Sequence, residues 1–281
     1  MATETLDAFS AALPMLALAG AVALGVLVAL GRPWLTERRR ARLRARPFPK
    51  AWRLLLRRHV PQVALLPPDL QQRLKGHVQV FLAEKPFIGC RGQPVHDGLR
   101  LSVAAQACLL LLGDDRSDYF PQLRQVLVYP GAFIVDRVAH QGSGLQQEQK
   151  RALVGESWQQ GQVLLSWADV QAGATKPADG QNVVLHEFAH QIDQDKGAAD
   201  GRPWRASRAS RRQWDAVMGQ AFRQLQHEPS ALFGAYAATD PAEFFAVATE
   251  RFFEQPKLLF EQVPDVYREL ARLYRVHPLV W

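Results

Sequence analysis

A five-residue motif constrains the fold of this 281-residue chain more than any other feature of its sequence. Residues 186–190 read His-Glu-Phe-Ala-His, which is an H-E-x-x-H pattern. On a helix, positions i and i+4 lie on one face, so both imidazoles would reach one metal ion. The surrounding residues are mostly apolar, and a buried histidine pair is costly without a metal or other partners. The pattern therefore predicts a core helix with His186 and His190 as zinc ligands, in preference to two incidental histidines.

The motif also predicts a catalytic base and requires a third ligand. Glu187 lies beside the first histidine, where its carboxylate would reach a water on the metal. Catalytic zinc usually has three protein ligands and one open position. The residue six positions after His190, where some zinc peptidases carry a further ligand, is Lys196. The third ligand is therefore expected on a later helix, which the sequence predicts around residues 242–250.

Glu243 is the best candidate for the third ligand, but its position has a second interpretation. Asp240, Pro241 and Glu243 occupy the N-cap, first and third positions of the predicted helix, which is a capping-box arrangement. Spacing alone favours cap and ligand equally. Glu250 and Glu254 lie roughly on the same helix face as Glu243, and Glu250 remains an alternative ligand.

The charge distribution separates a basic segment from the rest of the chain. The net charge is +7, but residues 32–60 hold eleven Arg or Lys against the single acid Glu37, which gives +10. The remainder therefore carries 7 − 10 = −3. Because the body is mildly acidic, the net charge does not predict nucleic-acid binding, and no direct nucleic-acid partner is expected.

A charge-free run near the N-terminus suggests a membrane anchor. Residues 8–31 carry no charge and, at 1.5 Å per helical residue, would span a hydrocarbon core of ~30 Å. A secretory signal peptide would begin with basic residues, whereas Glu4 and Asp7 are the only charges before this run. Basic residues that follow a span stay in the cytoplasm. We therefore expect a single-pass bacterial inner-membrane protein with a cytoplasmic catalytic domain; a buried helix and an exported, cleaved protein are the alternatives.

These features divide the chain into four predicted segments. The Arg run would attract anionic lipid as well as set the topology. The two cysteines, Cys90 and Cys108, are too few for a disulfide framework and are expected to stay reduced. The segments are a short tail at 1–7, a transmembrane helix at 8–31, a basic juxtamembrane segment at 32–60, and a folded domain at 61–281.

The folded domain shows strand patterns first and helix patterns later, which predicts an α+β class. Apolar residues make up 48% of the chain, so a packed core is expected and global disorder is excluded. The strand at 162–167 is a candidate edge strand on which an extended peptide would lie. The predicted elements are a helix from Asp69 to Glu84, a buried helix at 101–112, strands at 125–129, 133–136 and 162–167, and helices from Asn182 onward.

Four blocks of the sequence resemble the Mlc titration factor A family of zinc metallopeptidases. The last block is specific to this family and to its relatives around the anthrax lethal factor catalytic domain. The resemblance covers roughly residues 60–281 and implies a zincin-like (gluzincin) domain with one Zn2+ per chain. The blocks are Val126-Leu127-Val128-Tyr129-Pro130, the stretch 155–161, the His186 motif, and the stretch from Tyr236 to Glu243.

The resemblance also implies roles for individual residues. In that family the glutamate that matches Glu243 is the third zinc ligand, and a tyrosine seven residues earlier, here Tyr236, faces the metal. Carried over, His186, His190 and Glu243 bind zinc. Glu187 is the general base toward a zinc-activated water, and Tyr236 donates a hydrogen bond to the oxyanion.

Two functions are therefore expected. The first is a zinc-dependent peptidase that acts on a peptide or protein substrate, with aminopeptidase action as one form. The resemblance ties this peptidase to the regulation of sugar uptake. The alternative is a regulatory module that sequesters a transcriptional repressor, with catalysis secondary. The complete set of ligands, base and tyrosine favours catalysis, and a hydrolase of non-peptide amides is a weaker third option.

Overall fold

The structure is a computed structural model that describes residues 2–114, 118–131, 161–175, 178–197, 199–204 and 207–281. The chain divides into two compact units, Met1–Arg46 and Pro47–Trp281. The predicted segment boundaries within residues 1–60 stay predictions.

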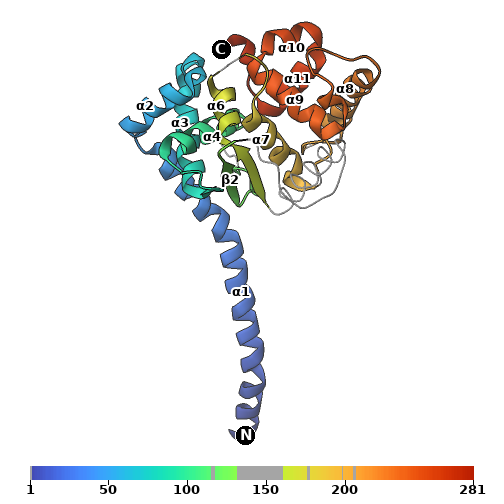
Figure 1. The fold of residues 1–281 in the computed structure, drawn as a ribbon. Helices are drawn as coiled ribbons and strands as arrows, with labels where there is room; N and C mark the ends of the chain where they lie inside the picture. Colours follow the sequence, from blue (N-terminus) through green and yellow to red (C-terminus); the bar gives the residue numbers. More distant parts are fainter. Residues whose placement is uncertain (1, 115–117, 132–160, 176–177, 198, 205–206) are drawn as a thin grey trace, which may run out of the picture. The chain divides into compact units, whose positions relative to one another are not determined.

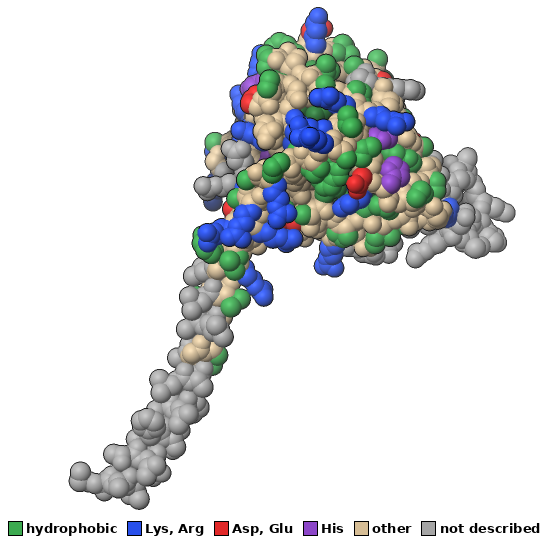
Figure 2. All heavy atoms as spheres, turned by 90° about the vertical axis from the view of Figure 1, so that its left-hand side faces the viewer, with side chains coloured by type: hydrophobic (Ala, Val, Ile, Leu, Met, Phe, Trp, Pro, Cys, Tyr) green, Lys and Arg blue, Asp and Glu red, His purple; other side chains and the backbone are tan. Residues whose placement is uncertain are grey.

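The first unit is one long helix, α1, which covers Ala2–Ala45. Its last turns carry the Arg run, where Figure 2 shows Lys and Arg side chains gathered. Among the residues that the structure describes, no helix combines the length and the apolar character needed to cross a membrane. The predicted transmembrane helix at 8–31 and the single-pass inner-membrane location are therefore wrong, and the lipid contact of the Arg run loses its basis.

The membrane prediction rested on the length of the charge-free run, on its Leu, Ala and Val content and on the arginines that follow it. Residues 8–31 include eight Ala and three Gly. The gain on leaving water scales with apolar area, so these small side chains contribute little to it. A charge-free run of this composition therefore does not by itself define a membrane span.

The second unit is mainly helical (Figure 1). Within the described residues, its N-terminal half alternates helices with three short strands, and the regular elements of its C-terminal half are helices. The longer elements are α2 (Lys50–His59), α3 (Pro68–Glu84), β1 (Phe87–Gly89), α4 (Asp97–Leu109), β2 (Gln125–Tyr129), β3 (Gln162–Ser166), α6 (Trp167–Thr175), α7 (Val183–Asp193), α8 (Arg208–His227), α9 (Pro241–Glu254), α10 (Pro256–Gln262) and α11 (Pro264–Tyr274). Short 3-10 helices are η1 (Pro61–Leu65), η2 (Gln194–Lys196), η3 (Tyr236–Ala238) and η4 (Pro278–Val280).

The three described strands form one parallel sheet in the order β1-β2-β3. In this register Ile88 lies opposite Leu127, which in turn lies opposite Leu164. Parallel neighbours need long crossover connections, and α4 lies between β1 and β2 in the chain. The predicted α+β order, strands first and helices later, is therefore wrong: helices precede and separate the strands and make up most of the domain.

Several local predictions are confirmed. The strand at 125–129 is present, and the strand predicted at 162–167 covers Gln162–Ser166, with Trp167 at the start of α6. The buried helix predicted at 101–112 is α4, which begins earlier, at Asp97, and ends at Leu109. Helix α3 ends at Glu84 as expected, but it begins at Pro68, with Asp69 inside its first turn and not at the N-cap. The predicted strand at 133–136 lies outside the described residues.

A cluster of aromatic rings in the core holds α7 in place. The Phe188 ring is fully buried, with its centroid 4.7 Å from the Phe120 ring and 5.7 Å from the Phe81 ring. Helix α7 also packs against β3 and against α9, which belongs to the C-terminal group of helices α8–α11 in Figure 1. The polar motif of α7 is therefore fixed between the sheet and the C-terminal helices.

Candidate metal centre

Helix α7 presents the histidine motif from a well-defined first turn. Asn182 occupies the N-cap, where its side chain accepts a hydrogen bond from the Leu185 N–H at 3.1 Å. Asparagine is among the preferred N-cap residues because its oxygen satisfies a backbone donor that has no partner within the helix. Phe188 lies on the buried side of the helix, and His186 and His190 lie one turn apart. Their ring centroids are 4.9 Å from each other.

The start of α9 separates the two interpretations of Glu243. The Asp240 side chain caps the helix and accepts from the backbone N–H groups of Ala242 at 2.9 Å and Glu243 at 3.0 Å. Pro241 follows at the first helical position, as predicted. The Glu243 carboxylate instead lies 3.1 Å from His186 Nε2. Asp240 therefore makes the cap with its own side chain, while the Glu243 side chain faces the histidines.

Three donor atoms meet between α7 and α9. His190 Nε2 lies 3.2 Å from His186 Nε2 and 3.6 Å from Glu243 Oε2. All three candidate ligand atoms lie within 4.8 Å of one another. The side chain of His190 is fully buried, and those of His186 and Glu243 are 14% and 9% exposed. The structure thus brings together two residues of one helix and one residue of another.

Glu250 orients His186 from the side opposite to Glu243. Its Oε1 atom lies 2.8 Å from His186 Nδ1. A proton on Nδ1 that is donated to this carboxylate leaves the Nε2 lone pair for a metal, which is the usual second contact of a ligand histidine. The other oxygen of Glu250 accepts from the Asn182 N–H at 2.5 Å. Both oxygens of Glu250 therefore have partners, whereas Glu243 directs one oxygen at the Nε2 atoms of both histidines.

The site is strongly polarised. Burial lowers the pKa of His186, but its hydrogen bonds with Glu243 and Glu250 outweigh burial and raise that pKa well above its ordinary value. Burial would raise the pKa of Glu243, yet the contacts with His186 and His190 hold it far below its ordinary value. A buried carboxylate is thus kept ionised beside two imidazoles that share its charge.

This donor set fits a divalent metal ion. Two imidazole nitrogens and one carboxylate oxygen form a ligand set found in catalytic zinc sites. Metal ligands must be deprotonated, so a cation would take the place of the proton that the imidazoles and Glu243 share. His186 would be the most exposed of the three ligands, and its Nδ1 contact with Glu250 already fixes the ring.

The other two predicted site residues lie beside this cluster. Glu187 follows His186 on α7 and is half-buried. Tyr236 begins η3, and its ring centroid lies 6.0 Å from that of His186, with 40% of the residue exposed. The charge of Glu187 contributes to the raised pKa of His186, and the Tyr236 ring lies beside the His186 ring at a partly exposed position.

Sequence reasoning missed part of the support around the metal centre. The Asn182 side-chain amide donates to Gln106 Oε1 at 2.8 Å and to Glu254 Oε1 at 2.9 Å. The second oxygen of Glu254 accepts from the Ala178 N–H at 2.9 Å. The sequence could have indicated Asn182, because an asparagine directly before an apolar helix is a typical N-cap residue. It could not have indicated Gln106, which lies 76 residues away in the chain.

Comparisons with known proteins identify a family for this chain. Residues 34–275 match the profile of the family described as Glucose-regulated metallo-peptidase M90. An uncharacterized protein of Synechocystis sp. is 35% identical over 265 residues, which cover 92% of this chain and 96% of that relative. The Mlc titration factor A proteins of Cronobacter sakazakii and Escherichia fergusonii are each 34% identical over 230 residues, 79% of this chain and 84% of theirs. A metallopeptidase family implies a metal ion. The chain therefore belongs to the family of glucose-regulated metallo-peptidases M90, as its resemblance to the Mlc titration factor A proteins had indicated.

Proposed function

We propose that the chain is a zinc-dependent peptidase in which Glu187 is the general base. The observation that carries the proposal is the convergence of three donor atoms, from His186, His190 and Glu243, within 4.8 Å of one another. Three protein ligands of this kind leave one position open on a catalytic zinc ion. Membership of a metallopeptidase family supports the same activity.

Glu187 and Glu250 would have different roles in the reaction. When bound, a zinc ion would supply Lewis-acid chemistry to the scissile carbonyl and to the attacking water. Glu187, half-buried beside His186, would take the proton of that water and then pass it to the leaving amine. The contact between Glu250 and His186 keeps the imidazole in one orientation throughout.

Tyr236 would stabilise the negative charge that develops on the carbonyl oxygen. Its partial exposure and its place beside His186 support this role, because a substrate can reach the hydroxyl. A hydrogen bond that strengthens in the transition state accelerates the reaction. Replacing Tyr236 by Phe should lower kcat by about 10²-fold with metal content and KM nearly unchanged. An equal kcat in the variant would contradict this role.

An extended substrate would add to the sheet along β3, which is at one edge of the three described strands. Main-chain hydrogen bonds would then bind a peptide of almost any sequence, and pockets for its side chains would determine specificity. Peptides with free and with acetylated N-termini separate aminopeptidase from internal cleavage. Hydrolysis of only the free form would assign aminopeptidase action.

The decisive test compares the full-length, zinc-loaded protein with its Glu187→Gln variant on a broad peptide panel. A general base typically contributes ~10²–10⁴-fold, so the variant should lose that factor in kcat while it still binds one zinc ion per chain. The matched control is Glu84→Gln, a glutamate at the end of α3 and outside the candidate site. Equal rates for Glu187→Gln and wild type at full zinc occupancy would sink the proposed mechanism.

The names of the Mlc titration factor A relatives support a second candidate function, binding to an Mlc-like transcriptional repressor. This function would be linked to sugar uptake and would not need Glu187. A pull-down with the purified repressor separates the two proposals. If the Glu187→Gln variant still binds the repressor, repressor binding does not depend on catalysis. If neither protein binds it, the repressor-binding function is ruled out.

A further inference from the structure

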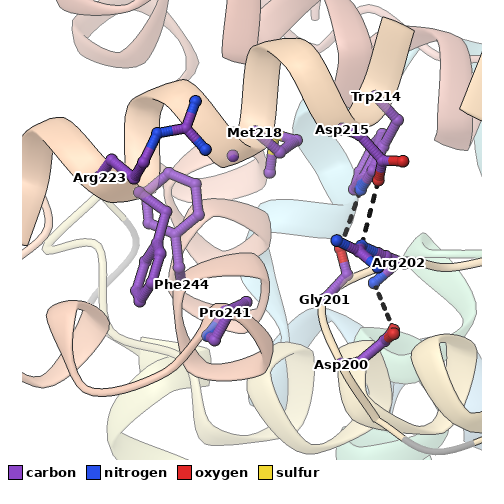
Figure 3. Close-up of a pocket in the computed structure, with 11 residues that line it drawn as sticks. Asp200, Gly201, Arg202, Trp214, Asp215, Met218, Arg223, Pro241 and Phe244 are labelled. Atoms are coloured by element: carbon purple, nitrogen blue, oxygen red, sulfur yellow. Dashed lines mark hydrogen bonds and ion pairs between the residues drawn. The ribbon is translucent and has the colours of Figure 1, made fainter. Parts of the chain in front are cut away.

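A cavity lies against the first turn of α9, the helix that carries Glu243. It lies between α8, the loop at 200–202 and the start of α9 (Figure 3), and its volume is about 170 Å³. None of the three candidate metal ligands lines it. Its principal lining residues are Arg202, Trp214, Met218, Arg223, Pro241 and Phe244.

The deep part of this pocket is apolar. Trp214, Met218 and Phe244 are each no more than 4% exposed. The Trp214 indole N–H donates to the Gly201 carbonyl at 2.8 Å, so its only polar group is already bonded. An apolar protein cavity of about 150 Å³ binds benzene. The pocket therefore has room for one aromatic or branched side chain, and it is smaller than the pockets that hold drug-sized ligands.

The rim of the pocket carries two arginines in different states. Arg202 is paired with Asp215 at 3.1 Å, and its backbone N–H donates to Asp200 at 3.1 Å. Arg223 forms no ion pair or hydrogen bond with the other residues drawn in Figure 3, and its guanidinium lies on the same side of the pocket as Phe244. Its Nη1 atom lies 3.3 Å from where a side chain on Gly219 would begin, so the glycine leaves room for it. The rim thus offers one guanidinium that is available to an anion.

The pocket adjoins the metal centre through α9. Glu243 faces the histidines, while Pro241 and Phe244, two residues before it and one after it, line the pocket. Successive helical residues are about 100° apart around the axis, so one helical turn presents Glu243 and Phe244 to neighbouring sides. A ligand that occupies the pocket would therefore lie against the same turn of α9 that carries Glu243.

We propose that this pocket binds the C-terminal residue of a short peptide substrate, with a large apolar side chain against Phe244 and Met218 and the carboxylate on Arg223. The inference rests on the proposed peptidase function and names its substrate class. An Arg–carboxylate pair is often bidentate, which fixes the orientation of the ligand as well as its charge. The apolar floor explains why the end residue would be aromatic or branched.

The chain offers a direct probe of this site. It contains three methionines, Met1, Met15 and Met218, and Met218 lines the pocket. Methyl-13C labelling of methionine therefore gives three NMR signals, and a Met218→Leu variant assigns the relevant one. The ligands are N-acetyl-Ala-Phe with a free carboxylate, the same peptide as its C-terminal amide, and 3-phenylpropionate. The protein is the full chain with Glu187→Gln, which prevents cleavage.

The free peptide acid should shift the Met218 methyl signal and bind roughly tenfold more tightly than the amide. Arg223→Gln should remove this difference, and Arg223→Lys should restore part of it. Arg212→Gln, an exposed arginine on the same helix that does not line the pocket, should leave the difference unchanged. The comparison of acid with amide needs no substitution at Arg223, so a folding defect of that variant cannot hide the answer.

Three results would overturn the inference. The first is equal affinity for the peptide acid and the peptide amide. The second is a Met218 methyl signal that does not shift at millimolar concentrations of the peptide acid. Either result would show that the pocket does not bind a peptide carboxylate. Tighter or equal binding of 3-phenylpropionate assigns the pocket to a free small acid in place of a peptide end.

Hydrolysis separates this inference from the proposed function on which it rests. Cleavage by wild type with the same KM for peptide acids and amides keeps the peptidase and overturns the pocket assignment. Acid-specific binding without any cleavage by the zinc-loaded wild type overturns the peptidase, and with it the assignment of the ligand as a substrate.

Discussion

The two ends of α9 use the same residue type for different purposes. Glu243, in the first turn, shares one oxygen between the Nε2 atoms of His186 and His190. Glu250 and Glu254, in the later turns, each have both oxygens in contact with donors from elsewhere in the chain. All three glutamates are buried, at 7–8% exposure.

The difference lies in what a metal ion could displace. The contacts of Glu243 are with imidazole nitrogens whose lone pairs suit a metal, so a cation can replace the shared proton. Two of the contacts of Glu250 and Glu254 are with the backbone N–H groups of Asn182 and Ala178, which cannot act as metal ligands. The function of a buried glutamate here follows from its partners and not from its burial or its helix face.

The largest effect that this comparison predicts is at Glu243. Glu243→Gln should lower metal affinity by more than 100-fold, because a neutral amide replaces the carboxylate ligand and a backing contact alone is worth 10–100-fold. The affinity is measured by competition with a chelating dye, and circular dichroism checks that the helices persist. Unchanged affinity would show that the three converging donors are not the metal ligands.

A smaller loss is expected at Glu250. Glu250→Gln leaves the three ligands in place but offers an amide to both His186 Nδ1 and the Asn182 N–H, and one of these donors then meets an NH2 group. Metal affinity should fall by roughly 10–100-fold. The same chelator competition measures it. A loss as large as that of Glu243→Gln would mean that Glu250 is itself a ligand and would end the contrast between the two ends of α9.

Glu254 should have the smallest effect on the metal. Burial raises its pKa, and it contacts Asn182 and Ala178 but neither histidine. Glu254→Gln should change metal affinity by less than about threefold, while a buried donor without an acceptor costs about 1–3 kcal/mol of unfolding free energy. Urea unfolding of the metal-free protein measures the second quantity. A tenfold loss of metal affinity would place Glu254 in the metal centre.

The residues of this contrast also show what a sequence can reveal. The spacing of His186 and His190 places both on one helix face because the helical repeat is fixed, and Asp240 and Pro241 mark the start of α9 by local backbone chemistry. The structure agrees on both points. Local rules therefore predicted these two helices, α7 and α9, and the residues that they carry.

Contacts between distant segments were beyond such rules. Whether Glu243 caps its own helix or faces the histidines depends on how α9 packs against α7, and spacing left both open. The parallel sheet joins three segments that no hairpin connects, so its topology depends on long crossovers. The N-terminal prediction failed for another reason: it took a long charge-free run of Leu, Ala and Val, followed by arginines, as a membrane span.

Asp193 gives the mildest test, because it is a buried carboxylate outside both ends of α9. Burial raises its pKa to about 7, although the Gly201 N–H donates to it at 2.7 Å. Since the folded state holds this proton more tightly than the unfolded state, its contribution to unfolding free energy is greatest below pH ~4 and falls as pH rises toward 7. Asp193→Asn should remove this decline, so the variant should gain about 2 kcal/mol relative to wild type between pH 5 and pH 8.

Urea unfolding of metal-free protein at the two pH values measures this change, with the exposed Asp69→Asn as the matched control. A difference between wild type and Asp193→Asn that does not vary with pH would mean that Asp193 is ionised at low cost in the fold. A pH-dependent gain would instead show that burial outweighs the backbone hydrogen bonds that Asp193 accepts, the one from Gly201 among them.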